Sequence, residues 1–207
     1  MGPPLPKKRL GIVIGGEKAA LAKSELEVFL DFTCPFSKKM YDTLKELVAP
    51  INYDKVRFVM MPMPQPWHPS SSVVHEAFHA AMMVSPQFVE EQDVFDCTMN
   101  IALEKFADVP SIDKSRLQMH KELADIYADK LGIDKANFLE RLALPEGDNL
   151  NPGVPATTNL KLYIKAARQL SMHVTPSIRL NSIACDSSSS WTSDEWQELI
   201  DTLEDRP

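Results

Sequence analysis

Cys34 is the residue whose type and position most clearly permit chemistry. It stands where an apolar, β-prone run, 28–32, gives way to a segment with helical spacing of its apolar side chains. Pro35 falls in the first turn of that predicted helix, where a missing N–H costs nothing. Unpaired amides at a helix start stabilise an anion, so we expect a nucleophilic thiolate. Two lysines at 38–39 act in the same direction, and we expect Ser37 to turn its hydroxyl toward the sulfur. A buried, inert cysteine is the alternative.

A second chemical pattern is His75-Glu-Ala-Phe-His79, which matches the H-E-x-x-H motif of zinc proteases. Its histidines are one helical turn apart, and Glu76 is placed as a base. A catalytic zinc needs three protein ligands and an open position, and no third ligand follows in a recognisable motif. Both histidines flank the apolar stripe of a predicted helix, 73–82, which indicates the helix surface. We therefore expect no metal site.

The turn Cys34-Pro-Phe-Ser37 resembles the active-site turn of thioredoxin-fold proteins, in the version with serine at the second cysteine position. A second mark, His173-Val-Thr-Pro-Ser-Ile-Arg-Leu180, resembles the segment that carries a cis-proline opposite the cysteine. The two marks lie too far apart for plain thioredoxin. Their separation resembles that of the DsbA-like branch, in which a helical insertion splits the fold. Kappa-class glutathione transferases and their isomerase relatives share that branch, with turns such as Ser-Pro-Tyr-Ser or Ser-Pro-Phe-Ser.

The resemblance implies an α/β thioredoxin fold, with a central mixed sheet interrupted by an α-helical insertion. Segments 1–66 and 172–207 would form the thioredoxin-fold domain, and 67–171 the insertion within it. The family's backbone before the cis-proline pairs with a peptide or with glutathione. The implied catalytic residues are Cys34 and Ser37, and the implied substrate- or glutathione-binding residues are Pro35, Phe36, Val174, Thr175 and Pro176.

The segment from Pro62 to Pro69 alternates prolines with other residues and is predicted to be stiff and extended. It leaves a strand next to that of Cys34, at the end of the sheet where ligands bind in open sheets. Trp67 would then wall a pocket, and His68 would contact the thiolate or a substrate. Alternatively, Trp67 plugs the junction with the insertion and His68 faces water. Gln65-Pro-Trp-His-Pro-Ser-Ser resembles a signature of a eukaryotic DsbA-like subgroup, which implies no particular substrate.

The remaining elements follow from apolar periodicity and from turn residues. Serines at 70–72 are placed to cap the first helix of the insertion. Thr192 and Glu195 have capping-box spacing, with Trp191 and Trp196 at the staple positions, so a C-terminal helix should begin there. We expect strands at 10–14, 56–61, 177–180 and 183–185, and helices from Cys34 to about 48 and near 87–104, 113–131, 134–142 and 158–171.

Composition bounds the function. The chain has 207 residues, 44% hydrophobic, with a net charge of −7, which is typical of one globular domain and argues against nucleic acid or an anionic membrane as partner. Three cysteines are too few for a disulfide framework. Cys97 and Cys185 are expected to be structural, although Cys185 could serve as a distant resolving thiol. No apolar run at the N-terminus is long enough for a signal peptide, so we expect a cytoplasmic protein.

The leading hypothesis is a monothiol enzyme that uses Cys34 as nucleophile, because a single thiol forms mixed disulfides that a second thiol, such as glutathione, must resolve. It would be a glutathione-linked transferase or a thiol–disulfide oxidoreductase acting on a small-molecule or thiol substrate. One alternative is an isomerase, or another biosynthetic enzyme of secondary metabolism, on the same fold. Another is a non-catalytic binding protein. Kappa-class relatives are dimers, so a homodimer stays open.

Overall fold

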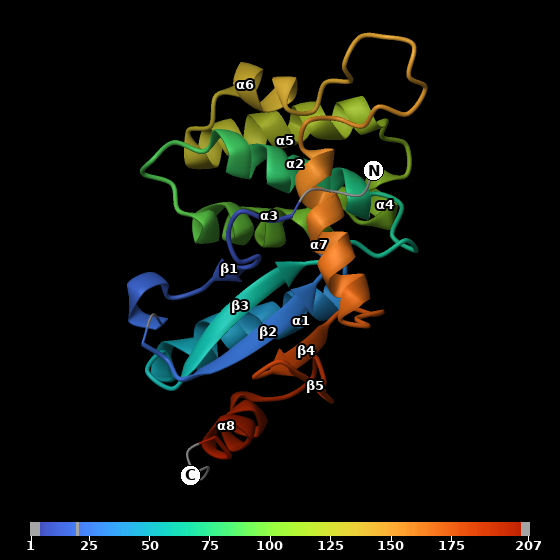
Figure 1. The fold of residues 1–207 in the computed structure, drawn as a ribbon. Coiled ribbons are helices and arrows are strands. Elements are labelled where there is room, and N and C mark those ends of the chain that lie inside the picture. Colours follow the sequence, from blue (N-terminus) through green and yellow to red (C-terminus); the bar gives the residue numbers. More distant parts are fainter. Residues whose placement is uncertain (1–4, 20, 204–207) are drawn as a thin grey trace.

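The computed structural model of the chain describes residues 5–19 and 21–203. The ends of the predicted thioredoxin-fold segments, 1–4 and 204–207, lie outside these ranges. The strands are β1 (Ile12–Val13), β2 (Ser24–Leu30), β3 (Val56–Pro62), β4 (Ser177–Leu180) and β5 (Ile183–Cys185). They form one sheet in the order β1-β3-β2-β4-β5, in which β2 and β3 are parallel and the other pairs antiparallel (Figure 1). The predicted central mixed sheet is confirmed.

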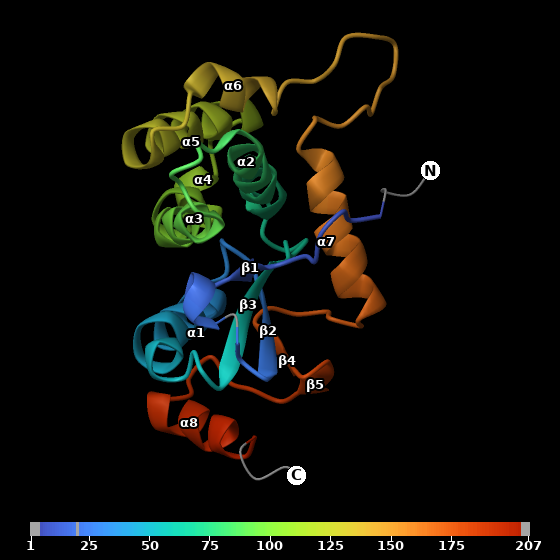
Figure 2. The same ribbon diagram turned by 60° about the vertical axis from the view of Figure 1, so that its left-hand side comes forward.

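Helices surround this sheet on both faces and extend beyond its end. They are α1 (Pro35–Thr43), α2 (Ser71–Val84), α3 (Glu91–Phe106), α4 (Asp108–Ser111), α5 (Arg116–Leu131), α6 (Lys135–Glu140), α7 (Thr157–Gln169) and α8 (Ser193–Asp201). α2 to α6 form a separate layer beyond the sheet, and α7 runs from that layer down along the sheet (Figures 1 and 2). α1 covers one face of the sheet and α7 the other (Figure 2). The helices predicted between the two marks therefore exist.

Alternate residues of the two central strands face these two layers, as expected for side chains that alternate across a strand. One core joins the sheet to α1, α8 and the insertion, and it includes Val28, Leu30, Phe58, Met60, Met40, Phe95 and Trp196. A smaller core lies under α7 and consists of Phe29, Val59, Met61, Met63, Ala167 and Met172. The last helix before the second mark therefore packs on the sheet itself.

The segment before β1, residues 5–11, passes along α7 as a strap (Figure 2). Gly11 joins this strap to the sheet, where its amide donates to the Tyr163 hydroxyl of α7 at 3.0 Å. Its φ is +103°, and a Cβ there would lie 2.3 Å from Cγ1 of Val59. Only glycine therefore allows the strap to approach β3 this closely.

Two helix starts differ in how they are built. Thr192 Oγ1 accepts from the Glu195 amide at 3.3 Å, and Glu195 Oε2 accepts from the Thr192 amide at 2.6 Å, which confirms the predicted capping box of α8. The side-chain cap predicted from the serines at 70–72 is not formed. Ser70 precedes α2 but makes no side-chain cap bond, because its hydroxyl donates to the Phe106 carbonyl.

The helix predicted from Cys34 to about 48 changes character along its length. α1 ends at Thr43 and is followed by a π-helical turn, Leu44–Val48, and a 3-10 turn, Ala49–Ile51. Over the described ranges, the helices are too short or too polar to cross a membrane.

Candidate active site

Cys34 caps the N-terminus of α1, four residues after the last residue of β2. Its backbone is extended, with φ −87° and ψ 120°, and Pro35 begins the helix, as predicted. The Cys34 amide donates to the Asp31 carbonyl at 3.1 Å, and its own carbonyl accepts from the Lys38 amide at 3.1 Å. Only 4% of the Cys34 surface is exposed. The positive end of α1 thus lies against a thiol that is held in place by backbone bonds on both sides.

The sulfur faces the second mark of the sequence. Cys34 Sγ lies 3.6 Å from the carbonyl oxygen of Thr175, and the Thr175–Pro176 peptide bond is cis. The predicted cis bond is therefore confirmed. β4 begins at Ser177 and pairs with β2, where Ser177 stands opposite Phe29. Antiparallel pairing between β2 and β4 brings the two distant segments together at one end of the sheet.

Ser37 lies within the first turn of α1 but does not bond to the sulfur. It is fully buried, and its hydroxyl oxygen accepts from the Asp31 amide at 3.1 Å. Across the described chain, the sulfur has no hydrogen bond with Ser37, so the expectation that this hydroxyl turns toward it is not met. The Ser37 hydroxyl instead holds the backbone just after β2.

Asp31 organises the loop beneath the cysteine. The side chain is fully buried. One carboxylate oxygen accepts from the amide and hydroxyl of Thr33, and the other from the Gln65 amide and the Ser71 hydroxyl, all at 2.9 Å. It therefore connects the cysteine loop to the proline-rich segment and to the start of α2. Sequence reasoning missed this residue, although an acid inside the apolar run 28–32 was the available signal.

The proline-rich segment forms one wall of a cavity of about 300 Å³. Trp67, Gln65 and Met63 line it from one side, and Met172 and Arg168 from α7 and the loop that follows. Trp67 walls this cavity and leaves more than half of its surface exposed. His68 does not line it. Its ring nitrogen Nδ1 instead lies 3.7 Å from the Asp108 carboxylate.

The sequence matches a known protein family over nearly its whole length. Residues 7–202 match the family model described as thioredoxin. The chain belongs to the thioredoxin family. No curated protein matches it in sequence.

Solved structures show which version of the fold this thioredoxin-family protein adopts. A candidate protein-disulfide isomerase from Pseudomonas syringae superposes with a TM-score of 0.67 at 24% identity, over 87% of this chain and 94% of its own. A thioredoxin-like oxidoreductase from Silicibacter pomeroyi gives 0.62 at 14% identity, over 95% and 94%. Pseudomonas aeruginosa DsbA gives 0.55 at 18% identity, over 94% and 88%. The predicted DsbA-like thioredoxin fold is therefore confirmed.

Exposed residues flank the thioredoxin-family cysteine on two sides. Pro35 and Phe36 on α1 are exposed, and so is Val174 on the facing loop. Thr175 is half-buried, and its hydroxyl has no hydrogen-bond partner in the described structure. A substrate that reaches Cys34 would pass between these apolar surfaces and meet the backbone of the cis-proline loop. The binding roles of these residues stay predictions.

The other two thiols of this thioredoxin-family chain lie in different elements. Cys97 is buried in α3, and burial raises its thiol pKa to about 11. Cys185 lies in edge strand β5, and burial, the largest effect there, also raises its pKa. Both thiols are therefore poor nucleophiles near neutral pH, because the thiolate is the reactive form.

The H-E-x-x-H histidines are inside the protein, so their expected surface position is wrong. His75 and His79 are buried, and burial lowers both pKa values, that of His79 to about 3. His79 stacks on Tyr163 with ring centroids 5.0 Å apart. Glu76 pairs with Arg116 at 2.5 Å and accepts from the Thr157 hydroxyl at 2.7 Å. Among the described residues, no three His, Cys, Asp or Glu side chains group as metal ligands.

Proposed function

We propose that this protein is a monothiol thiol–disulfide oxidoreductase in which Cys34 is the nucleophile. The observation that carries the proposal is the position of Cys34 Sγ, at a helix N-terminus and 3.6 Å from the Thr175 carbonyl before a cis-proline. The positive end of the α1 dipole lies against the sulfur. The cis-proline loop offers a backbone that can align a substrate against the sulfur.

The reaction would proceed by two exchanges. The Cys34 thiolate attacks one sulfur of a disulfide, forms a mixed disulfide and releases the other sulfur as a thiolate, which takes up a proton. A second thiol then attacks the mixed disulfide and frees Cys34. The substrate disulfide supplies the oxidising equivalents, and the second thiol carries them away.

We infer that the second thiol comes from outside the chain. Ser37 stands one turn after Cys34 and has no sulfur, while Cys97 and Cys185 have raised pKa values in other elements. We propose glutathione as this thiol, acting in the cytoplasm, where glutathione keeps thiols reduced. Family membership and the named oxidoreductases among the similar structures support thiol exchange in general.

A glutathione-linked transferase or isomerase acting on a small molecule is the second candidate. The cavity of about 300 Å³ beside the cis-proline loop favours it, because Met63, Trp67 and Met172 give it apolar walls. Here Cys34 or the glutathione sulfur would add to an electrophilic carbon. A kappa-class-like activity of this kind would leave disulfide exchange as a side reaction.

Intact-protein mass spectrometry after incubation with oxidised glutathione tests the proposal. We expect one glutathionyl adduct on the wild type and on Cys97→Ser and Cys185→Ser, and none on Cys34→Ser. A coupled assay then follows the reduction of a glutathione mixed disulfide by glutathione. Loss of turnover by about 100-fold in Cys34→Ser alone would support the oxidoreductase. An adduct without turnover would favour the second candidate. Absence of any adduct at Cys34 would favour a non-catalytic binding protein.

A further inference from the structure

The outer face of α7 carries three cations that have no acidic partner in the part of the chain that the structure describes. Lys161, Lys165 and Arg168 follow one another at helical spacing and therefore share one face, about 10 Å long. None of them makes an ion pair or a side-chain hydrogen bond within the described ranges. α7 itself contains no acidic residue. We call these three residues the basic face of α7.

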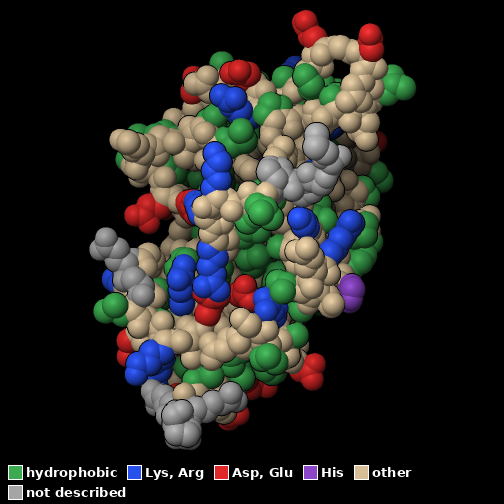
Figure 3. Space-filling view, in the orientation of Figure 1, with side chains coloured by type: hydrophobic (Ala, Val, Ile, Leu, Met, Phe, Trp, Pro, Cys, Tyr) green, Lys and Arg blue, Asp and Glu red, His purple; other side chains and the backbone are tan. Residues whose placement is uncertain are grey.

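The other basic side chains near the front of the molecule are mostly paired. Lys8 pairs with Glu91, and Arg9 with Glu25. Figure 3 shows the same contrast, since basic side chains over the sheet lie next to acidic ones, whereas those over α7 lie among hydrophobic ones. In a chain with a net charge of −7, the basic face is thus a local exception.

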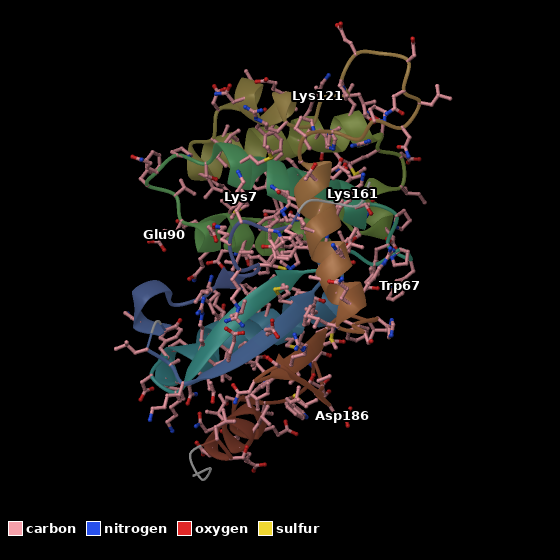
Figure 4. All side chains as sticks on the ribbon, viewed as in Figure 1. Lys7, Trp67, Glu90, Lys121, Lys161 and Asp186 are labelled. Carbon is pink, nitrogen blue, oxygen red and sulfur yellow. The ribbon has the colours of Figure 1, made fainter. Side chains whose placement is uncertain are left out.

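The basic face continues into the cavity beside the cysteine loop. Ile164 and Arg168 line both a shallow groove along α7 and the cavity walled by Trp67. His173 also lines the cavity and lies two residues before Thr175, the residue whose carbonyl contacts Cys34 Sγ. Neither hollow has an acidic residue in its lining. Lys161 and Trp67 lie along the same side of the molecule in Figure 4, while Lys121 lies near the far end of the insertion.

We propose that the basic face of α7 selects small disulfides that carry carboxylates and guides them to Cys34. The inference rests on the proposed thiol exchange and names its substrate class. Unpaired cations at the rim of a cavity raise the local concentration of anions, whereas the net negative charge of the protein as a whole repels them. Arg168 provides a planar fork that suits a carboxylate. The apolar walls accept the remainder of the substrate.

The exchange rate with a charged and a neutral disulfide measures this selectivity. The probes are 5,5′-dithiobis(2-nitrobenzoate), a dianion, and 4,4′-dithiodipyridine, which is neutral at pH 7.5. A Cys97→Ser/Cys185→Ser background leaves Cys34 as the sole thiol. In each reaction the Cys34 thiolate displaces one aromatic thiolate, whose absorbance gives the second-order rate constant. The quantity of interest is the ratio of the dianion rate to the neutral rate.

We expect Arg168→Glu to lower this ratio about fivefold, and Lys161→Glu/Arg168→Glu to lower it more than about tenfold, at low salt. The matched control is Lys121→Glu, which makes the same charge change on α5 and should leave the ratio within about twofold. An unchanged ratio in Arg168→Glu would overturn the proposal. An equal fall in Lys121→Glu would also overturn it, because net charge alone would then explain the result.

An equilibrium measurement separates this proposal from the proposed function. Calorimetric titration in the Cys97→Ser/Cys185→Ser background, with Cys34→Ser added so that no thiol is left, reports binding of the dianionic probe without exchange. Weaker binding by about fivefold in Cys34→Ser/Arg168→Glu supports the basic face even if Cys34 proves unreactive. Equal binding by the two variants overturns it. Failure of both probes to react with Cys34 would instead refute the thiol chemistry.

Discussion

Ser71 donates its hydroxyl to a carboxylate oxygen of Asp31 across 40 residues of sequence, at 2.9 Å and in the protein interior. The same oxygen accepts from the Gln65 amide. One buried side chain thus ties the cysteine loop to both the proline-rich segment and α2. The contact explains why the insertion and the sheet keep one arrangement around Cys34.

Replacing Asp31 by asparagine should therefore destabilise the whole protein. An amide side chain presents an N–H₂ group toward at least one pair of donors, so two buried hydrogen bonds are lost. We expect the free energy of unfolding to fall by about 3 kcal/mol, and by about 1 kcal/mol in Ser71→Ala. Urea denaturation of both single variants and the double variant measures the coupling. Strict additivity would contradict a shared network.

Ser37→Cys should convert the monothiol site into a dithiol site. The new sulfur would lie one helical turn from Cys34, as in proteins with two cysteines in this turn. After treatment with oxidised glutathione, we expect an internal disulfide and no retained glutathionyl group, whereas the wild type keeps its adduct. Intact-protein mass spectrometry distinguishes the two products. Ser37→Ala is the control and should keep the adduct. An adduct that persists on Ser37→Cys would show that the side chain of residue 37 cannot reach the Cys34 sulfur.

The stability of the protein should depend on pH through His79. Burial lowers its pKa in the folded state to about 3, whereas an unfolded histidine titrates near 6.5. Between these values the unfolded state binds one more proton, so stability falls as pH falls. We expect His79 to contribute a slope of about 1.4 kcal/mol per pH unit between pH 6 and pH 4.

His79→Phe tests this slope, because phenylalanine preserves a ring against Tyr163 and removes the titrating group. Urea denaturation at several pH values gives the free energy of unfolding for both proteins. The variant should lose less stability on acidification than the wild type, whatever its absolute stability. Parallel pH profiles would show that His79 is protonated without cost.

Zinc should neither bind the H-E-x-x-H segment nor stabilise the protein. Glu76 is already engaged by Arg116 and by the Thr157 hydroxyl, and both histidines are buried. We expect the melting temperature to be the same with zinc and with a chelator. Glu76→Gln should lower the free energy of unfolding by about 1–2 kcal/mol through these lost contacts. A rise in melting temperature with zinc would refute this assignment.

The two marks around Cys34 and Pro176 could be predicted because each has strong local signals. A β-prone run followed by a helical period fixes Cys34 at a strand-to-helix junction, and the predicted hairpin at 177–185 follows directly after Pro176. The end of the sheet where they meet follows from antiparallel pairing of β2 with β4. The positions of both segments therefore depend on local sequence signals and on the pairing of β2 with β4.

The predictions that the structure contradicts concern side chains whose partners lie far away in the sequence. Ser37 and Ser70 bond to groups that no local pattern reveals, at the end of β2 and at the end of α3. An apolar stripe on one side of α2 predicts His75 and His79 at the surface. In the structure, α2 packs between other helices and α7, so burial extends around its circumference. Tertiary contacts therefore determine the hydrogen bonds of the two serines and the burial of the two histidines.

The sheet order has a consequence for the protein during its synthesis. β2 and β3 can pair early. The other edge of β2 stays unpaired until β4 has been synthesised. The Cys34 sulfur likewise has no contact with Thr175 until that residue, 141 positions later, has been added. At about 5–20 residues per second, this interval lasts roughly 7 to 28 seconds. During it, the ribosome-bound chain presents an apolar strand edge and an uncovered thiol to the surrounding solution. Nascent chains of this protein should therefore rely on chaperones that shield such edges, and on a reducing environment, until the C-terminal strands emerge.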